Sequence, residues 1–434
     1  MVVALLVGGG VALAQQGDPP DPSGGSAGNV IDGQYIVVLK GGVSDPRDVA
    51  REHARKYGAE VLYTYDDALN GYAAHIPAQK LDEVRNDPNV SFVSADRRVH
   101  AFAQSLPKGV DRIQGDLSPT ANIDNIDDRV NAKVAIIDTG IDLDHPDLNV
   151  AQEGRNCSSG STYDDGNGHG THVAGTVAAK DDGSGVVGVA PGATVYPVRV
   201  LNNAGSGSWS SVACGIDWVS ANAASKGIKV ANMSLGGSGS DDSENGKTCV
   251  TTANALRKAI CGSVAKGVTY VVAAGNSNKN FSGFVPAAYN EVLTVTAMAD
   301  FNGQPGGGAA ATCRSDVDDT PADFSNFTQV GSSDVGHTIA APGVCIRSTW
   351  KGGKYNTISG TSMASPHVAG TAALCITSGK CTGSPASVAS TLRQDAATKT
   401  GNDRSVSGYY GFTGDPNSPV NTRYYGYLVH AGGY

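Results

Sequence analysis

Runs of apolar residues bounded by turn residues divide the chain into two regions of different pattern. In the first region, apolar runs at 35–39, 61–65, 71–76 and 90–93 predict strands, and 46–57 and 78–85 predict helices. The order strand–helix–strand–strand–helix–strand is typical of a small open-faced α+β domain. We expect this domain to end near residue 98.

From about residue 130, fully apolar runs alternate with helical stretches of small residues. Strands are expected at 134–137, 195–201, 230–235, 269–274 and 292–297, and helices near 169–179, 208–224, 251–266 and 361–377. A continuous apolar run such as Val134-Ala135-Ile136-Ile137 predicts a strand buried on both faces. This region therefore predicts an α/β fold, a parallel sheet sandwiched between helices, with its functional site beyond the carboxyl ends of the strands.

Composition and charge narrow the possible classes of protein. Of 434 residues 57 are glycine and 17% are charged, which indicates many tight turns and close backbone approaches. The glycines follow no collagen-like period, and the recurring apolar segments argue against a disordered chain. The formal net charge is −9 without a lysine- or arginine-rich run, so nucleic acid is not an expected partner.

The first residues resemble an export signal. Residues 2–14 are apolar and end in Ala12-Leu13-Ala14, too short a stretch to span a membrane but with the small-x-small end of a signal-peptide cleavage site. The usual basic start is missing, so the alternative is a disordered apolar tail. We expect a signal peptide, truncated at its start, at 1–14, a flexible linker at 15–32, and a secreted, extracellular protein with no membrane partner.

The cysteines support the same compartment. There are eight, none in a CxxC pair, so thiolate metal sites are not expected, and an even number in an exported protein favours disulfides. Roughly a hundred connectivities are possible. The shortest closures would pair Cys249 with Cys261, Cys313 with Cys345 and Cys375 with Cys381, leaving Cys157 with Cys214. The alternative is that some are buried free thiols.

Three islands of polar residues lie where strands end or helices begin. Asp138-Thr139-Gly140 follows a buried strand, His169-Gly170-Thr171-His172 opens one helix, and Gly360-Thr361-Ser362-Met363-Ala364-Ser365-Pro366-His367 opens another. Pro366 fits only the first turn of a helix, which places Ser362 at or just before a helix start, where developing negative charge is favoured. An Asp, a His and a Ser can together activate a nucleophilic hydroxyl. Each island alone has an ordinary structural explanation.

Taken together, and in the order Asp, His, Ser, these islands resemble the signatures of subtilisin-like serine peptidases over about residues 33–380. The resemblance implies a three-layer catalytic domain at 103–434, with Ser362 as nucleophile, His169 as general base and Asp138 as its orienting partner. It also implies that Asn276, after the strand 271–274, donates to the oxyanion, although an Asn after Gly is otherwise a turn residue. His145, His172, His337 and His367 are expected to be structural, because the HExxH spacing of a zinc hydrolase is missing.

The resemblance extends to the substrate cleft. Gly205-Ser206-Gly207 and Ser234-Leu235-Gly236-Gly237 are similar to the segments that flank an extended substrate in the family, although both could be simple loops. Ser234 to Gly236 with Ala273, Ala274 and Gly275 would line the primary pocket, and Trp209 with Leu235 a second apolar one. Since Ser277 adds no charge at the rim, we expect broad cleavage of proteins and peptides after bulky hydrophobic residues.

Residues 33–102 resemble the inhibitory propeptide of the same family. The junction Val99-His100-Ala101-Phe102-Ala103-Gln104-Ser105 is similar to its processing site, so we expect a cut between Phe102 and Ala103. The released domain would stay bound to the enzyme as an inhibitor. The alternative is that these residues form a permanent domain.

The segment 179–188 resembles the calcium loop of many subtilisins. Its implied ligands are the side chains of Gln104, Asp147 and Asp182 and the carbonyls of Lys180, Ser184 and Val186. Gln104 would be free to reach the loop only after cleavage at Phe102. The alternative is a solvated loop with ordinary surface carboxylates.

Two broader expectations complete the interpretation. The protein is expected to be a monomer, and its aromatic, glycine-rich stretch 400–434, which matches no family motif, is expected to pack against the catalytic domain. A catalytically silent binding or scaffold protein on the same fold is the alternative function, and labelling of Ser362 by a fluorophosphonate would distinguish the two.

Overall fold

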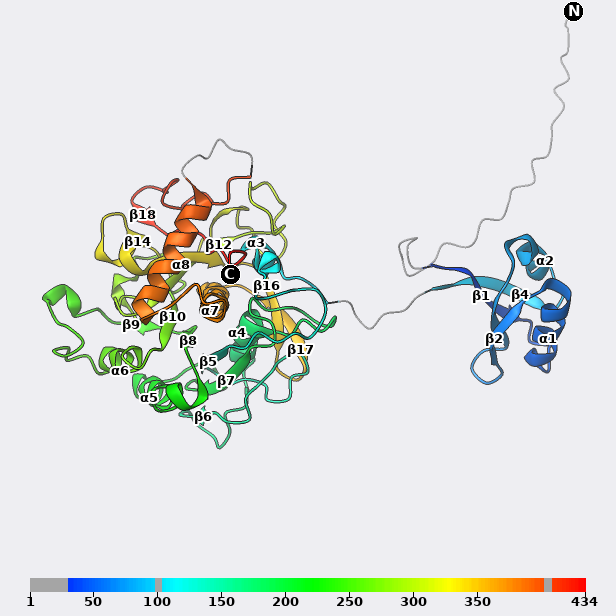
Figure 1. Ribbon diagram of the computed structural model, residues 1–434, viewed down its shortest axis with the longest axis horizontal. Helices are drawn as coiled ribbons and strands as arrows, with labels where there is room; N and C mark the ends of the chain where they lie inside the picture. The colour runs from blue at the N-terminus through cyan, green and yellow to red at the C-terminus, as the bar shows by residue number, and fades with distance from the viewer. Residues whose placement is uncertain (1–29, 98–103, 402–407) are drawn as a thin grey trace, which may run out of the picture. The chain divides into compact units, whose positions relative to one another are not determined.

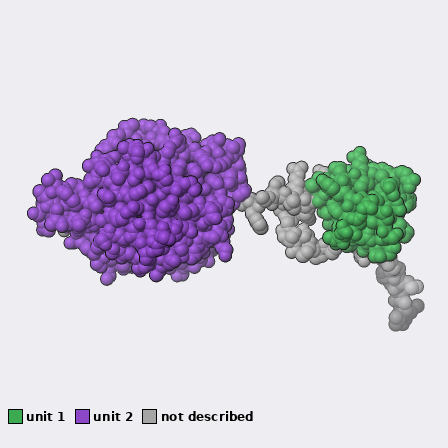
Figure 2. Space-filling model, turned by 90° about the horizontal axis from the view of Figure 1, so that it is seen from below, with its two compact units in different colours: residues 1–101 green, residues 102–434 purple. Residues whose placement is uncertain are grey.

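The computed structural model describes residues 30–97, 104–401 and 408–434 and divides into two compact units, 1–101 and 102–434 (Figures 1 and 2). The expected signal peptide at 1–14 and the expected cut between Phe102 and Ala103 lie outside the described residues. None of the helices in the described ranges has the length and apolar character needed to cross a bilayer.

The first unit is a four-stranded antiparallel sheet in the order β2-β3-β1-β4. Its elements are β1 (Val30–Leu39), α1 (Pro46–Tyr57), β2 (Glu60–Tyr65), β3 (Gly71–His75), η2 (Ala78–Lys80), α2 (Leu81–Arg85) and β4 (Val90–Arg97). Helix α1 begins where Asp45 accepts a hydrogen bond from the Arg47 N–H and ends at Gly58 in the left-handed conformation. The expected order of elements is confirmed, but β1 starts at Val30, inside the range expected for the linker.

The second unit is built on a largely parallel sheet in the order β13-β12-β10-β8-β5-β7-β6, with β15 also paired to β12. Only β13 is antiparallel to its neighbour in this sheet. The strands are β5 (Lys133–Asp138), β6 (Arg155–Asn156), β7 (Thr194–Arg199), β8 (Val230–Met233), β10 (Thr269–Ala273), β12 (Leu293–Ala299), β13 (Thr320–Pro321) and β15 (Thr338–Pro342). The predicted α/β fold is therefore confirmed.

Helices cover both faces of this sheet (Figure 1). On one side, α4 (His169–Ala178), α7 (Thr361–Thr377) and α8 (Pro385–Thr400) share a core with Val134 and Ile136. On the other, α5 (Trp209–Lys226) and α6 (Ala255–Val264) share a core with Ala135 and Ile137. Successive strand residues point to opposite faces, which is why the strand reads as a continuous apolar run.

Several elements differ from those expected. Helix α6 is shorter than 251–266, because Asn254 caps its start by accepting from the Leu256 and Arg257 N–H groups. Strand β15, helix α8 and the hairpin of β16 (Ile346–Trp350) and β17 (Lys354–Ile358) were not expected. Shorter elements include α3 (Lys108–Arg112), η3 (Gly115–Leu117), β9 (Gly237–Ser238), η4 (Ser243–Asn245), η5 (Phe281–Gly283), β11 (Phe284–Val285), β14 (Thr328–Gln329), η6 (Ser333–His337) and β18 (Arg423–Tyr424).

The strand order reverses at β5, which lies between β7 and β8. In open α/β sheets the crevice for ligands forms at such a point, beyond the carboxyl ends of the strands. Asp138 ends β5, Ser234 follows β8 and Asn276 lies shortly after β10. The topology therefore brings three of the candidate residues to one edge of the sheet.

The described part of the C-terminal stretch packs against the rest of the second unit, as expected. Its aromatic side chains Tyr410, Phe412, Tyr425 and Tyr434 are buried in the larger core. Arg112 donates to the carbonyls of Tyr410 and Gly411 at 2.8 and 3.1 Å. The stretch thus closes the surface of the unit beside α3.

Four disulfides join the cysteines in the pairs that the shortest closures give: Cys157–Cys214, Cys249–Cys261, Cys313–Cys345 and Cys375–Cys381. No free cysteine is present. Disulfides of this number are typical of exported proteins.

Candidate active site

Asp138 is the centre of the candidate site. It is fully buried at the end of β5, and its Oδ1 accepts hydrogen bonds from the Thr139 N–H and from His169 Nδ1, both at 2.7 Å. A buried carboxylate requires such partners, because isolated burial of its charge is strongly unfavourable. The bond to Nδ1 leaves Nε2 of a neutral His169 as the proton acceptor.

His169 is the first residue of α4, and its side chain is one-quarter exposed to a cleft. Burial lowers the pKa of the imidazole, but the negative charge of Asp138 and its hydrogen bond raise it more, with a further contribution from Asp165. The pKa of His169 therefore lies above its ordinary value. Stabilisation of the imidazolium is what a general base needs at the moment it accepts a proton.

Asp165 joins the end of β5 to the start of α4. Its Oδ1 accepts from Thr139 Oγ1, Asn167 N and Gly168 N, and its Oδ2 accepts from the N–H and hydroxyl of Thr171. The two elements also touch at Gly170, where a Cβ would lie 2.1 Å from the Gly140 carbonyl oxygen. The sequence interpretation missed Asp165, because its partners are identified only once the two elements are side by side.

Ser362 is the second residue of α7, half-buried, with its Oγ donating to the Ser234 carbonyl at 3.2 Å. The expectation that Pro366 lies in the first turn is wrong, since α7 begins at Thr361 and Pro366 is inside the helix. The expected position of Ser362 near the helix start is nevertheless correct. Gly360 precedes the helix without a side-chain cap, so no capping residue marks the exact start of the helix in the sequence.

Asn276 presents its amide group beside Ser362. Its Oδ1 accepts from the N–H and the hydroxyl of Thr361, both at 2.8 Å, which orients the amide and leaves Nδ2 on the other side. A Cβ built on Gly360 would lie 3.4 Å from Asn276 Nδ2 and 3.6 Å from the Ser362 nitrogen. The two nitrogens therefore lie near one point, as the two donors of an oxyanion hole would.

A cleft of about 690 Å³ lies beside these residues. Its walls include residues of the predicted substrate-binding segments, namely Gly205, Ser206, Gly207, Trp209, Ser234, Leu235, Gly236 and Gly237. Thr139, Asn167, Leu201, Ser208, Val212 and Ser238 also line it and were not predicted. Trp209 lies over Gly237, where a Cβ would be 2.8 Å from Cζ2 of the indole. The two predicted segments are thus walls of one cleft, which His169 also lines.

Ala273, Ala274 and Gly275, which are predicted for the primary pocket, are not among the residues that line this cleft. Ala274 is fully buried and packs with Phe281 and Ala287. Gly275 adopts φ +102°, and a Cβ there would lie 2.4 Å from Asn326 Nδ2. These residues hold the turn that carries Asn276.

The four histidines that were expected to be structural contact other residues. His145 Nε2 contacts the Lys354 carbonyl, His172 Nε2 contacts the Ile346 carbonyl, and His367 Nδ1 contacts the Met363 carbonyl. His337 is buried against Phe281. No zinc-type cluster of histidines is found in the described parts of the chain.

The loop that resembles a calcium site has features that fit a cation. Asp147 is buried with Oδ1 unpartnered while Oδ2 accepts from the Val186 N–H, and burial raises the pKa of this carboxyl to about 7. Gln104 Oε1 accepts from the Gly183 N–H, and its Nε2 donates to Asp181 Oδ1 at 2.5 Å. Asp182 is exposed on the same loop. A buried carboxylate oxygen without a hydrogen-bond partner is the kind of ligand that Ca²⁺ takes.

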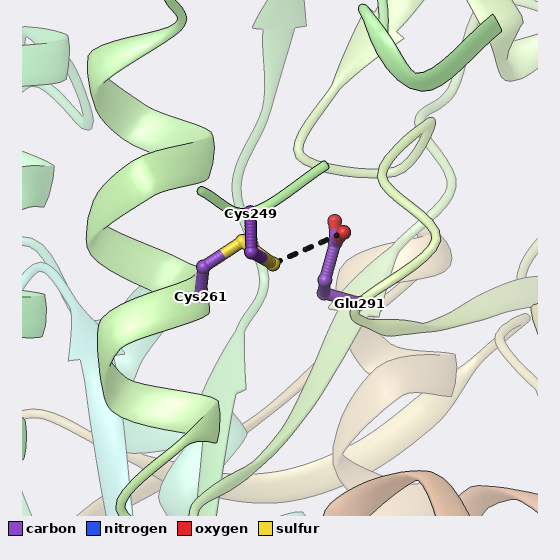
Figure 3. Close-up of side chains that lie close together, drawn as sticks. All are labelled: Cys249, Cys261 and Glu291. Atoms are coloured by element: carbon purple, nitrogen blue, oxygen red, sulfur yellow. Dashed lines mark hydrogen bonds between the residues drawn. A yellow bond between two sulfur atoms is a disulfide. The ribbon is translucent and has the colours of Figure 1, made fainter. Parts of the chain in front are cut away.

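Cys249, Cys261 and Glu291 form the one close group of potential metal ligands among the described residues (Figure 3). The two sulfurs are bonded to each other, and Glu291 is paired with the Arg257 guanidinium at 2.8 Å. A disulfide sulfur is not a thiolate ligand, so this group is structural.

Comparison with known proteins defines the class of the chain. Residues 130–413 match the Subtilase family, Peptidase_S8, and residues 34–102 match Peptidase inhibitor I9. The fold and the family match together define a serine endopeptidase with a propeptide domain. The chain belongs to the subtilase family.

Individual relatives show how much of the chain is shared. Subtilisin NAT of Bacillus subtilis subsp. natto is 36% identical over 353 residues, 79% of this chain and 80% of that protein. Subtilisin DY of Bacillus licheniformis is 40% identical over 279 residues, 63% of this chain and 85% of that protein. The crystal structure of a cold adapted subtilisin-like serine proteinase aligns with 80% of this chain and 94% of that one at 29% identity, with a TM-score of 0.48.

Proposed function

We propose that the chain hydrolyses peptide bonds through Asp138, His169 and Ser362. Ser362 Oγ attacks the scissile carbonyl carbon while His169 Nε2 takes the hydroxyl proton, and Asp138 holds the resulting imidazolium. Asn276 Nδ2 and the Ser362 N–H donate to the oxyanion. Collapse of this intermediate breaks the C–N bond, His169 protonates the leaving amine, and an acyl-enzyme ester remains on Ser362.

Hydrolysis of the acyl-enzyme by water completes the cycle, and the same residues take part in it. His169 takes a proton from water, the hydroxide attacks the ester carbonyl, and the proton returns to Ser362 Oγ as the acid product leaves. In the structure the Ser362 hydroxyl donates to the Ser234 carbonyl, so in the first step its O–H has to turn from Ser234 toward His169.

The observation that carries this proposal is the 2.7 Å bond between Asp138 and His169 at the wall of a cleft that Ser234 also lines. The Ser234 carbonyl accepts from the hydroxyl of Ser362, so the nucleophile is bonded to a residue in the wall of the cleft that the base also lines.

Fluorophosphonate labelling followed by peptide mapping tests the proposal. We expect the wild-type chain to be labelled at Ser362 and to cleave protein substrates, and Ser362→Ala to do neither. Ser378→Ala, at the other end of the same helix, is the matched control and should keep both activities. A folded wild-type chain that is neither labelled nor active would instead be a binding or scaffold protein on this fold.

The cleft favours extended peptides with apolar side chains. Backbone segments 205–207 and 234–236 can pair with a substrate strand, and Trp209 with Leu235 provides an apolar wall. Since Ser277 adds no charge at the rim of the predicted primary pocket, we infer broad specificity with bulky hydrophobic residues before the cut. Clear preference for Arg or Glu at that position in a peptide panel would contradict this.

We propose that residues 33–102 act as a propeptide cleaved from the enzyme between Phe102 and Ala103. The match of 34–102 to an inhibitor family supports this role. Mass spectrometry of the mature protein should find Ala103 at its N-terminus. An active protein with an intact junction would show that the domain is permanent.

The proposal places the enzyme outside the cell, acting on proteins and peptides as a monomer. The apolar segment at 2–14 and the four disulfides support export. Detection of the mature chain in the culture medium tests it.

We also propose a structural Ca²⁺ held by the side chains of Gln104, Asp147 and Asp182 with the carbonyls of Lys180, Ser184 and Val186. When bound, the ion would stabilise the loop rather than take part in the chemistry. The orphaned Oδ1 of Asp147 supports this assignment.

A further inference from the structure

The helix that carries Ser362 has a gap in its backbone hydrogen bonding. In an α-helix each carbonyl accepts from the N–H four residues later, so the partner of the Ser362 carbonyl would be residue 366. That residue is Pro366, which has no N–H. A carbonyl next to the nucleophile is therefore left without its helical partner.

The hydroxyl of Ser234 fills this gap. Ser234 Oγ donates to the Ser362 carbonyl at 2.7 Å, while the Ser234 carbonyl accepts from Ser362 Oγ at 3.2 Å. Ser234 thus contacts both the backbone and the side chain of Ser362, although it belongs to the segment after β8 that lines the cleft.

Asn232 determines the direction of this contact. Its Nδ2 donates to Ser234 Oγ at 2.9 Å, so the hydroxyl hydrogen of Ser234 is directed at Ser362. Its Oδ1 accepts from Ser365 Oγ at 2.7 Å, on the same helix. The side chains of Asn232 and Ser365 are fully buried, and Ser234 is 4% exposed.

The buried side-chain amide of Asn232 is unfavourable unless both its nitrogen and its oxygen form hydrogen bonds. Asn232 lies in β8 opposite Ile136 of one neighbouring strand and Val271 of the other, in an apolar core. Burial of an unpaired amide would be destabilising, so the two hydrogen bonds explain why the position tolerates Asn.

We propose that Asn232 is a positioning residue for Ser362, acting through Ser234 and Ser365. It holds the first turns of α7 at two points and ties them to the segment 234–236, so the nucleophile and the cleft wall keep one relative position. This inference rests on the proposed catalytic role of Ser362.

The test compares the full chains of Ser234→Ala, Asn232→Leu and Ser365→Ala with the wild type. We expect kcat, and the rate of reaction with a small fluorophosphonate, to fall about 10- to 100-fold in Ser234→Ala and Asn232→Leu, since small misplacements of reacting groups have effects of that size. KM should change little in Asn232→Leu. The double variant Asn232→Leu/Ser365→Ala should be no slower than Asn232→Leu alone.

Thr371→Val is the matched control for lost stability. Thr371 is buried in the same helix, and its hydroxyl donates to the His367 carbonyl without contact with Ser234. The thermal midpoint of Thr371→Val should fall, while its rate of reaction with the fluorophosphonate should stay at the wild-type value. If Asn232→Leu does not fold, the fluorophosphonate rate of Ser365→Ala is compared with that of Thr371→Val instead. Ser365→Ala removes only the hydrogen bond from Ser365 to Asn232.

The outcomes separate the two proposals. A wild-type chain that reacts normally, with Ser234, Asn232 and Ser365 variants no slower than Thr371→Val, overturns the positioning role alone. A wild-type chain that reacts with neither peptide nor fluorophosphonate overturns the proposed function.

Discussion

Arg112 and Asp319 form a buried ion pair across 207 positions of sequence. Two nitrogens of the guanidinium, Nε and one Nη, donate to the same carboxylate oxygen at 3.0 and 2.9 Å, and Arg112 is 1% exposed. The same guanidinium also holds Tyr410 and Gly411. One side chain thus joins the start of the catalytic unit, the loop before β13 and the C-terminal stretch.

Removal of this guanidinium should strongly destabilise the catalytic unit. Arg112→Met leaves Asp319 buried without its cation, and loss of one partner of a buried pair typically lowers the free energy of unfolding by about 3–5 kcal/mol. Denaturant unfolding measures the change. Arg129→Met, which breaks an exposed pair with Asp127, should change it by only about 0–1 kcal/mol. Equal effects of the two variants would contradict the prediction.

The acid limb of the pH–rate profile should lie above the ordinary histidine value of about 6.5. His169 must be neutral to accept a proton, and its raised pKa keeps it protonated to higher pH, so activity is lost as pH falls through that pKa. Asp165→Asn removes a negative charge that favours the imidazolium, so the limb of kcat/KM should move to lower pH. Asp318→Asn, a buried carboxylate bonded to the Phe301 and Ala309 N–H groups, should leave it in place.

Loss of the Asn276 amide should slow catalysis without weakening substrate binding. In Asn276→Ala we expect kcat to fall about 10²–10³-fold, equivalent to about 2.7–4 kcal/mol, a range measured on subtilisin itself. KM should stay near the wild-type value, because the donor acts on the oxyanion. Asn280→Ala removes an amide that caps η5 and should leave kcat unchanged. A parallel rise in KM would argue for a general binding role.

Replacement of Trp209 should lower kcat/KM for long substrates only. Trp209→Ala removes the aromatic wall over Gly237, so kcat/KM for a peptide that occupies this part of the cleft should fall about tenfold, or about 1.4 kcal/mol. A short ester that does not reach it should react at the wild-type rate. Trp209→Phe keeps an apolar wall and should recover most of the loss, whereas equal loss on both substrates would indicate a disturbed active site.

A chelator should lower the thermal midpoint of the mature enzyme if calcium occupies the loop at 180–186. Asp147→Asn removes the orphaned carboxylate oxygen, so this variant should lose both the calcium-dependent stabilisation and the effect of the chelator. Asp144→Asn changes an exposed neighbour and should respond to the chelator like the wild type. A wild-type midpoint that is unchanged by chelation would count against the site.

The sequence predicted best where a single segment carries the signal. Val134–Ile137 reads as a buried strand because it is apolar on both faces, and the islands of Asp138, His169 and Ser362 are long enough to be specific. Helix α8 was missed, because its polar and small residues form no marked apolar stripe.

Features that need a partner from elsewhere in the chain could not be predicted. Asp165 and Asn232 are single polar residues whose roles depend on contacts with another element, Thr139 for the first and Ser365 for the second. Pro366 was placed wrongly because it lies inside the helix. The hydrogen bond that its backbone cannot donate to the Ser362 carbonyl is replaced by one from the hydroxyl of Ser234, which is distant in the sequence. Tertiary contacts of this kind override the local preference.

The Cys157–Cys214 bond closes a covalent ring that contains two exposed segments, one of which includes cleft-lining residues 205–209. Residues 159–162 and 203–210 are exposed, and both lie inside the ring together with His169. Neighbouring copies of an endopeptidase would attack such segments first. A single cut in the ring opens it without releasing a fragment, so a nicked molecule keeps its full mass until its disulfides are reduced.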